Sequence, residues 1–244
     1  MILSYKQIEE IADATMHDFN EFFFGTGPEA DEIRATPIDQ FASEYLKLRV
    51  RIERLCMDES ICGITAYTDT TLLADMNGVS VPVPIKQNEV LLNIHFMQPG
   101  NIRKLCGQRR FTLAHECAHQ LLFQLASDER KAACRRMYKG KNGYTARELK
   151  TKEDWDEWQA NALGAAILMP RSSFKTVADY LLRGRCIHSK TGELNWFGTT
   201  IVNELADCFH VSPRAAQIRL GHLGYIDEYG EESSCYPREE VVLG

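Results

Sequence analysis

The segment His115-Glu116-Cys117-Ala118-His119 places two imidazoles four residues apart, with a carboxylate between them. In a helix, residues four apart lie on the same face about one turn apart, so both imidazoles can hold one tetrahedral Zn²⁺ ion. Glu116 is turned away from direct ligation but can reach a water at the metal, as a general base for hydrolysis must. The segment therefore predicts a hydrolytic zinc site with His115 and His119 as ligands and Glu116 as base.

The residues around this pattern argue against a merely solvated surface cluster. Apolar side chains recur at helical spacing on both sides of it, which predicts one amphipathic helix that begins near Gln108. They are Phe111, Ala114, Ala118, Leu121, Leu122 and Leu125. A polar face in the middle of such a helix is costly to bury unless its groups have partners. Cys117 points off the ligand face, so we interpret it as a packed small side chain and not as a cysteine switch.

A hydrolytic zinc site takes a third protein ligand and leaves the fourth position to water. Glycine at position 122 and histidine at position 125 would complete a metzincin-type site, but both positions are leucine. The alternative is an acidic residue on a later helix, for which Glu153, Asp154 and Asp156 are rivals by composition. Only Glu157 begins the run into the apolar helix face that ends at Pro170. We therefore predict Glu157 as the third ligand.

Four polar residues are assigned to the surroundings of the metal. Asn161 lies four residues after Glu157 and on the same helix face, so we predict that it hydrogen-bonds a ligating histidine. A donor that stabilises the oxyanion should lie opposite the metal, and three side chains are candidates for it: Tyr138, Tyr144 and His188. The alternative for these three is an ordinary surface position.

The elements that must position these residues are mostly helical. A capping box at Ser4-x-x-Gln7 begins a first amphipathic helix, and Thr36-Pro37 sets up a second, which is expected to run to about Leu55. After the metal-binding helix, helical spacing of apolar residues predicts helices at residues 154–168, 172–183 and 200–209, and a last helix that starts at Ser212-Pro213 and ends before Gly221 or Gly224. Ser172 or Ser173 can cap the second of these helices. A short turn joins the last two, which form a helix-turn-helix-like pair.

A small β-sheet is expected between the second helix and the metal-binding helix. Stretches rich in Val, Ile, Thr and Leu predict short strands at residues 61–68, 79–85 and 89–95, and Pro82 and Pro84 suit an edge strand. The fold class is therefore α+β and mostly helical. We expect an N-terminal helix and loop, a metal-binding domain, a helical module and an acidic tail, at residues 1–35, 36–185, 195–228 and 229–244.

Composition and charge restrict the class of protein and its location. The N-terminus lacks the apolar core of a signal peptide and no 18 apolar residues run together, which predicts a cytoplasmic protein without a membrane span. The eight cysteines include no Cys-x-x-Cys pair, which favours reduced thiols. The net charge of −6 argues against nucleic-acid binding. From Glu193 to Gly224, three acidic residues and two arginines give −1, so direct DNA binding by the helical pair is not expected.

Three stretches of the chain resemble the ImmA/IrrE-type metallopeptidases. The first is Arg110-Phe111-Thr112-Leu113-Ala114-His115-Glu116-x-x-His119, and the second is Glu157-x-x-Ala160-Asn161-x-x-x-Ala165-x-x-Leu168-Met169-Pro170. The third is Leu205-Ala206-x-x-Phe209-x-Val211-Ser212-Pro213, followed by Arg219-Leu220-x-x-Leu223-Gly224. The chain departs from the family pattern at Gln159, where a second acidic residue is common, and in a long linker at residues 127–153.

The resemblance implies a zincin-like core and a gluzincin-like site. In that site zinc, or alternatively Mn²⁺, is held by His115, His119 and Glu157, with Glu116 as base. It also implies a substrate class, because family members commonly cleave a helix-turn-helix transcriptional repressor and so relieve repression in stress responses or mobile elements. Two other functions are open: a non-catalytic metal-sensing regulator, and a toxin–antitoxin component that acts by partner binding. Glu116 favours the enzyme, because a structural metal site needs no base and prefers four protein ligands.

Overall fold

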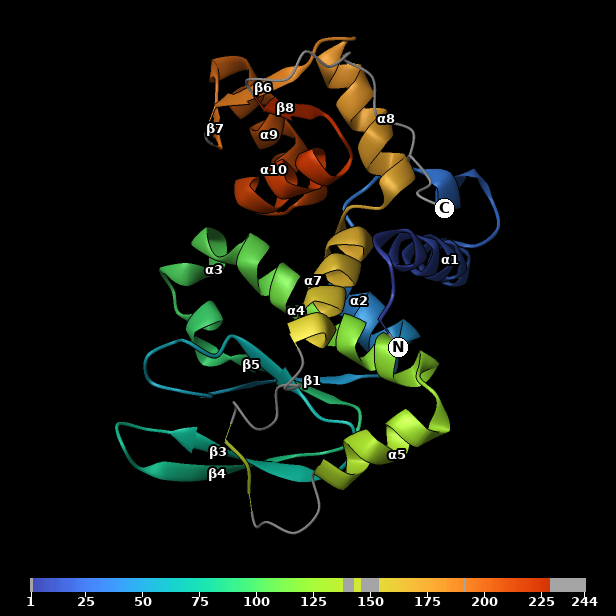
Figure 1. Cartoon of the computed structure of the whole chain (residues 1–244). Helices are drawn as coiled ribbons and strands as arrows, with labels where there is room; N and C mark the ends of the chain where they lie inside the picture. Colours follow the sequence, from blue (N-terminus) through green and yellow to red (C-terminus); the bar gives the residue numbers. More distant parts are fainter. Residues whose placement is uncertain (1, 138–142, 146–153, 191, 229–244) are drawn as a thin grey trace. The chain divides into compact units, whose positions relative to one another are not determined.

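The computed structural model describes residues 2–137, 143–145, 154–190 and 192–228, and this part of the chain combines many helices with small β-sheets (Figure 1). The α+β, mostly helical class predicted from the sequence is confirmed. The described residues form two compact units. The first consists of the residues up to Glu32 and of Thr36–Leu168, and the second consists of Ile33–Ala35 and the residues from Met169 onward.

The first unit begins with helix α1 (Tyr5–Phe24), which packs against α7 (Asp154–Leu168). The predicted capping box is present: the Gln7 amide donates to Ser4 Oγ at 3.3 Å, and the Ser4 amide donates to Gln7 Oε1 at 2.9 Å. The apolar face of α1 is buried through Ile8, Ala12, Met16 and Phe19. A short 3₁₀ turn, η1 (Pro28–Asp31), follows.

The prediction of a helix from residue 36 to about Leu55 is wrong over the second half of that range. Helical structure is limited to α2 (Ile38–Gln40) and the π-helical turn η2 (Phe41–Tyr45), and Lys47 then takes a left-handed backbone conformation with φ 56°. Residues Arg49–Glu53 form strand β1, which pairs in parallel with β5 (Glu89–Asn93). Pairing with a strand about 40 residues away overrides the local preference for helix, as tertiary context often does.

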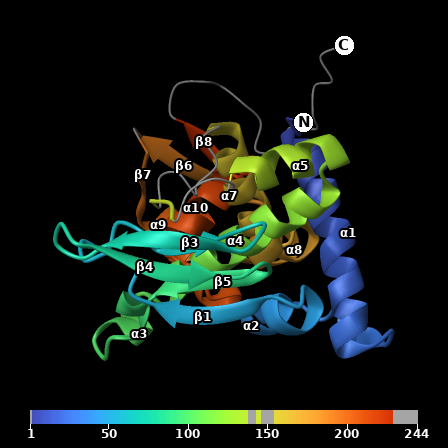
Figure 2. The same cartoon turned by 90° about the horizontal axis from the view of Figure 1, so that it is seen from below.

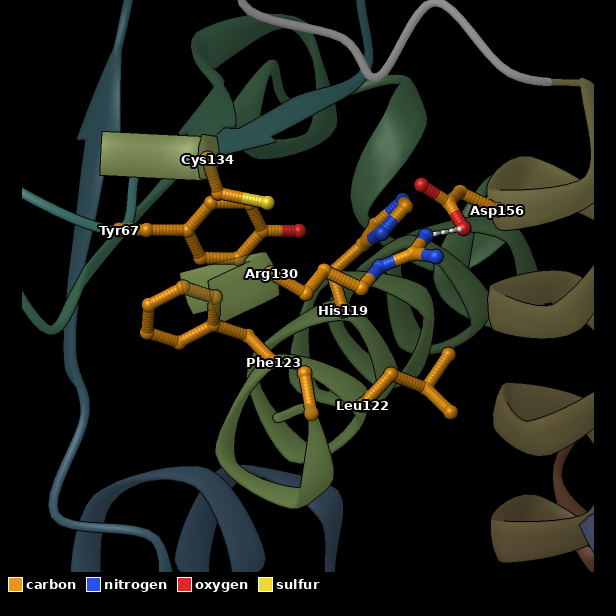
Figure 3. A pocket seen from close by; sticks show the side chains of 8 residues that line it. Tyr67, His119, Leu122, Phe123, Arg130, Cys134 and Asp156 are labelled. Carbon is orange, nitrogen blue, oxygen red and sulfur yellow. Dashed lines mark hydrogen bonds and ion pairs between the residues drawn. The ribbon is translucent and has the colours of Figure 1, made fainter. Parts of the chain in front are cut away.

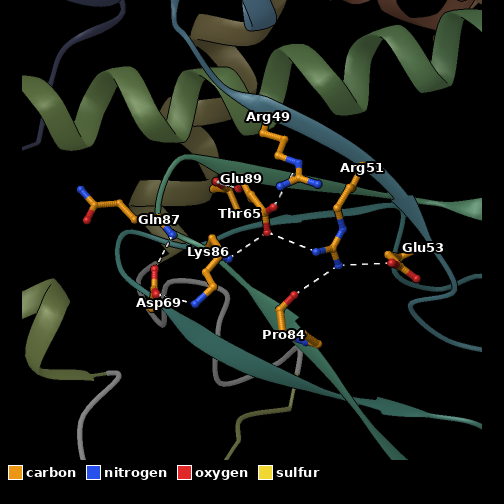
Figure 4. Close-up of polar contacts among 9 residues, drawn as sticks. All are labelled: Arg49, Arg51, Glu53, Thr65, Asp69, Pro84, Lys86, Gln87 and Glu89. Carbon is orange, nitrogen blue, oxygen red and sulfur yellow. Dashed lines mark hydrogen bonds and ion pairs between the residues drawn. The ribbon is translucent and has the colours of Figure 1, made fainter.

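The first sheet has the order β1-β5-β2, with β2 (Gly63–Thr65) antiparallel to β5. Its central strand β5 is buried at every residue, including the carboxylate of Glu89, which is only 2% exposed. The Lys86 amide donates to Glu89 Oε2 at 2.8 Å, and the guanidinium groups of Arg49 and Arg51 lie 3.5 and 3.4 Å from its oxygens (Figure 4). A buried carboxylate requires such partners. Glu89 thus connects β5 to β1 at the point where both strands begin.

Strands β3 (Thr70–Asp75) and β4 (Ser80–Ile85) form a separate antiparallel hairpin beside the first sheet (Figure 2). Asn77 and Gly78 turn the hairpin with φ values of 60° and 84°, which suit these two residue types. Among the described strands β4 pairs only with β3, so the edge position predicted from Pro82 and Pro84 is confirmed. The sequence did not predict β3 or β1 as strands.

The rest of the first unit is helical and carries the metal-binding segment. The 3₁₀ turn η3 (Ile94–Met97) and the short helix α3 (Asn101–Lys104) lead into α4 (Cys106–Leu125), and α5 (Asp128–Met137) follows α4. Helices α4 and α7 pack against each other, and α4 also packs against β2 and β5. The predicted helices around residues 108–125 and 154–168 are both confirmed.

The second unit contains α8 (Arg171–Leu182), α9 (Trp196–Phe209), α10 (Pro213–His222) and a small sheet of order β7-β6-β8. The strands are β6 (Ile187–Lys190), β7 (Glu193–Leu194) and β8 (Ile226–Glu228), none of which the sequence predicted. The predicted helical pair is present as α9 and α10. Helix α9 begins four residues earlier than predicted, because the side chain of Asn195 accepts a hydrogen bond from the Gly198 amide at 2.7 Å.

Two further details of the second unit concern helix caps and burial. Pro170 occupies the N-cap position of α8, so the prediction that Ser172 or Ser173 caps this helix is wrong. Arg219 on α10 is buried, and its Nε donates to the Met169 carbonyl at 3.1 Å.

No helix in the described part of the chain is both long and apolar enough to cross a membrane.

Candidate metal centre

Three side chains from two helices converge in the first unit. His115 and His119 lie one turn apart on α4, with their Nε2 atoms 3.0 Å from each other. Glu157 reaches them from α7, where its Oε2 is 3.3 Å from His115 Nε2 and its Oε1 is 3.5 Å from His119 Nε2. This is the group of His, Cys, Asp and Glu side chains that could hold a metal ion among the described residues.

The spacing of these donor atoms fits a tetrahedral metal ion. Nitrogen and oxygen ligands about 2.0–2.1 Å from a tetrahedral Zn²⁺ ion are about 3.3–3.4 Å apart. The three observed separations of 3.0, 3.3 and 3.5 Å lie around that value. The Glu157 side chain is 29% exposed, so solvent reaches this member of the group. Two imidazoles and one carboxylate are also a common donor set for zinc with one position left open.

The electrostatic state of Glu157 suits a ligand. Burial by itself raises the pKa of this carboxyl, but hydrogen bonds from His115 and His119 outweigh burial and hold the pKa well below its ordinary value. Glu157 is therefore a carboxylate at neutral pH, which is the form that binds a metal ion.

Gly164 explains how α7 comes close enough to present Glu157. A Cβ atom at this position would lie 3.1 Å from the His115 amide nitrogen and 3.2 Å from both His115 Cα and the Ala114 carbonyl carbon. All three are backbone atoms of α4, so the two helices touch through their backbones here. Glu157 precedes Gly164 by seven residues, or about two turns, and so lies on the same face of α7.

Glu116 lies on α4 and packs against strand β2. It is 5% exposed, and a Cβ atom on Gly63 would lie 3.1 Å from its Oε1 and 3.2 Å from its Cγ. The same Cβ atom would be 2.6 Å from Thr112 Cγ2, a distance that packed atoms do not adopt. Glycine at position 63 therefore leaves the space in which the Glu116 carboxylate lies.

A model of the IrrE N-terminal-like domain of peptidase family M78 matches residues 103–221, a range that includes both histidines, Glu116 and Glu157. The chain carries an IrrE N-terminal-like domain. A solved Mycobacterium tuberculosis transcriptional regulator is similar at 14% sequence identity with a TM-score of 0.38. That similarity covers 91% of this chain and 53% of the regulator, so this chain spans about half of the regulator's length. No curated protein matches the sequence.

The other predicted site residues lie in surroundings that differ from one residue to the next. Asn161 is exposed on α7, one turn after Glu157, and its contact with a histidine stays a prediction. Tyr144 is buried beside Leu72, with its backbone paired to β3. His188 lies on β6 in the second unit, and Tyr138 lies outside the described residues. The role of these three as oxyanion donors likewise stays a prediction.

Asp156 and Gln159, which are close to Glu157 in the sequence, make contacts with residues outside the candidate metal centre. Asp156, one of the rivals for the third ligand, forms an ion pair with Arg130 of α5. Gln159 is buried, accepts a hydrogen bond from the Leu3 amide at 2.8 Å and donates to the Trp155 carbonyl at 3.1 Å. An acidic side chain at position 159 has no N–H with which to make the second bond. Gln159, at which the chain departs from the family pattern, thus hydrogen-bonds the N-terminal segment through Leu3.

Cys117 lies inside the histidine motif but away from its chemistry. The side chain is fully buried, and burial raises the pKa of its thiol. A buried thiol of high pKa is a poor metal ligand and nucleophile, which agrees with its interpretation as a packed small side chain. Sequence reasoning missed Gly63 and Gly164, whose importance depends on contacts with elements far away in the chain.

Proposed function

We propose that the chain is a zinc-dependent endopeptidase that cleaves a helix-turn-helix transcriptional repressor. The observation that carries the peptidase proposal is the convergence of His115, His119 and Glu157 at tetrahedral spacing, next to the buried carboxylate of Glu116. The match to an M78 peptidase domain over the same residues supports it independently.

Each residue then has a defined role. His115, His119 and Glu157 would hold the metal, and a set of three protein ligands is typical of hydrolytic rather than structural zinc sites. When bound, zinc supplies Lewis acidity that activates a water molecule and polarises a peptide carbonyl. Glu116 accepts the proton of that water and later donates it to the leaving amine. Packing against Gly63 fixes the Glu116 carboxylate for both transfers.

Strand β2 lies beside the proposed base. In the sheet order β1-β5-β2, β2 is an outer strand, and among the described strands only β5 pairs with it. All three residues of β2 are buried, and Gly63 packs directly on Glu116. The strand therefore supports the position of the proposed base.

The substrate class comes from the resemblance to the ImmA/IrrE-type metallopeptidases, whose members commonly cleave helix-turn-helix repressors. The decisive experiment mixes the purified chain, loaded with zinc or manganese, with the helix-turn-helix protein encoded beside its gene. We expect cleavage at one or a few defined bonds, detected by mass spectrometry, and no cleavage with Glu116→Gln. Tight binding without cleavage under either metal would favour the non-catalytic regulator instead.

A further inference from the structure

Gln120, the residue after the proposed ligand His119, lies on the face of α4 that meets strand β2. Its side chain is buried, and its Nε2 donates to Thr65 Oγ1 at 2.5 Å and to the Ala66 carbonyl at 3.2 Å. Gln120 follows Glu116 by four residues, so the two side chains project from the same side of the helix about one turn apart. The helix face that presents the proposed base to β2 therefore also carries a hydrogen bond to that strand.

Thr65 connects this hydrogen bond to the centre of the sheet. Its side chain is buried, and its Oγ1 donates to the Glu89 carbonyl of β5 at 3.0 Å (Figure 4). A threonine hydroxyl has one proton, so while it donates to Glu89 it accepts from Gln120. The two bonds can thus form at the same time, and they link α4 through β2 to β5.

The stretch from Gly63 to Tyr67 follows α4 from Glu116 to Phe123. At its start Gly63 packs against Glu116. At its end the ring of Tyr67 stacks on that of Phe123, with centroids 4.3 Å apart and 9° between their planes (Figure 3). Packed surfaces and parallel rings can slide over each other, whereas a hydrogen bond weakens steeply as its distance and angle change. The bonds of Gln120, in the middle of this stretch, are therefore suited to fix where the strand lies along α4.

We propose that Gln120 is a positioning residue: through Thr65 it fixes β2 against α4 and so holds the Glu116 carboxylate where it can act as the base. The proposal rests on the proposed function, because that role of Glu116 is itself proposed. Gly63 transmits the effect, because its missing Cβ atom leaves the space in which the Glu116 carboxylate lies. A strand that shifts along α4 changes the shape of this space, and a small misplacement of a catalytic group is enough to slow a reaction.

Two variants of nearly unchanged shape remove the link from either end. Thr65→Val replaces the hydroxyl by a methyl group, and the Gln120 amide then keeps its bond to the Ala66 carbonyl. Gln120→Met removes the carboxamide at similar side-chain length, and the Thr65 hydroxyl then keeps its bond to the Glu89 carbonyl. Thr65→Ser is the conservative variant, because it retains the hydroxyl.

The position of β2 is measured without turnover, on the full chain with and without zinc. A Cβ atom on Gly63 would lie 2.6 Å from Thr112 Cγ2, so this methyl group and the Gly63 α protons are in contact and should give a strong nuclear Overhauser effect. We expect this effect to fall several-fold in Thr65→Val and in Gln120→Met, because its intensity decreases steeply with distance. It should keep its wild-type strength in Thr65→Ser.

Cleavage of the helix-turn-helix protein encoded beside the gene is the second measurement, with kcat and KM determined separately. Thr65→Val and Gln120→Met should each lower kcat on the order of 10–100-fold. KM and zinc affinity should stay at their wild-type values, because the proposed ligands come from α4 and α7. Thr65→Ser should restore most of the kcat lost in Thr65→Val. The double variant should lose no more than the slower single variant, because both changes remove the same bond.

Tyr225→Phe is the matched control for the loss of one hydrogen bond. Tyr225 is buried in the second unit, and its hydroxyl donates to Asp179 at 2.7 Å. This variant should lower the urea midpoint of unfolding, as Thr65→Val does, but keep the wild-type kcat. A merely structural role of Gln120 predicts the same behaviour for Gln120→Met.

The outcomes separate this proposal from the proposed function. If the Gly63–Thr112 effect keeps its wild-type strength in both variants, or if it falls while kcat does not, the positioning role is overturned and the peptidase stands. If the wild-type chain cleaves nothing, the proposed function fails and the role of Gln120 fails with it, whereas the Overhauser effect still shows whether the link holds β2. Should Gln120→Met not fold, the comparison of Thr65→Val with Thr65→Ser decides.

Discussion

Substituting Gly164 tests whether the close approach of α7 to α4 sets the spacing of the metal ligands. In Gly164→Ala the new Cβ atom would lie 3.1 Å from the His115 amide nitrogen and 3.2 Å from His115 Cα and the Ala114 carbonyl carbon. These atoms belong to a helix backbone, so no side chain can rotate away to make room. The two helices must therefore separate by a few tenths of an ångström, at the residue that provides one of the ligands.

The expected effects on stability and on zinc affinity differ in size. Overpacking of this kind costs about 1–3 kcal/mol, while replacing glycine by alanine inside a helix returns about 1 kcal/mol. The net loss in free energy of unfolding is then about 0–2 kcal/mol. The affinity for zinc should fall by about 10–100-fold, which is typical when a residue that supports a metal ligand is changed.

Competition with a chromogenic chelator measures the zinc affinity, and urea unfolding in the presence of a chelator measures the stability without metal. Gly221→Ala on α10 is the matched control, because a Cβ atom there meets nothing within 4 Å. It should leave zinc affinity unchanged and stabilise the chain by up to about 1 kcal/mol. Wild-type zinc affinity in Gly164→Ala would refute the idea that the backbone contact sets the ligand geometry.

Four other substitutions lead to distinct results. Glu116→Gln should keep zinc affinity within a few-fold in the same chelator assay and abolish cleavage of the repressor, and full activity would contradict its role as base. Glu157→Gln should remove the zinc-dependent rise in stability, which for the wild type is about 2.7 kcal/mol at a zinc concentration of 100 Kd. The pKa of Glu157 is lowered, so without metal its contribution to stability is complete above the unfolded pKa of about 4.3 and is lost as the pH falls through the folded value. The difference in urea midpoint between wild type and Glu157→Gln, measured with chelator, should therefore shrink as the pH is lowered below about 4, and a difference that grows would reverse the sign of this argument. Gly63→Ala should reduce cleavage more than zinc affinity, because the atoms nearest to its Cβ atom belong to Thr112 and Glu116 and not to a proposed ligand. Ser4→Ala should cost about 1 kcal/mol in urea unfolding through loss of the α1 cap, with no effect on zinc binding.

The three side chains of the candidate metal centre were predictable because their signals are local. His115 and His119 share a face of one helix by their spacing alone, and Glu157 begins a helical run whose apolar face continues to Pro170. Helical periodicity then brings the carboxylate to the side of α7 that packs on α4. No knowledge of the distant chain was needed beyond the expectation that the two helices pack.

The supports of the site were not predictable in the same way. Gly63 and Gly164 are needed because of what lies opposite them, and a single sequence does not contain that information. The local sequence predicts helix over β1, whereas hydrogen bonds to β5, about 40 residues away, decide its conformation. The pairing of Asp156 with Arg130, which leaves Glu157 as the carboxylate at the histidines, also depends on the position of α5.

Strands β1 and β2 form the two outer edges of the same sheet, and they differ in charge. β1 carries Arg49, whose side chain is 73% exposed, together with Arg51 and Glu53, and Arg51 pairs with both Glu53 and the buried Glu89. Charged side chains on an edge strand oppose its pairing with another chain. β2 consists of Gly63, Ile64 and Thr65, carries no charge and is buried at every residue. One edge of the sheet is thus protected from self-association by charge, and the other by burial.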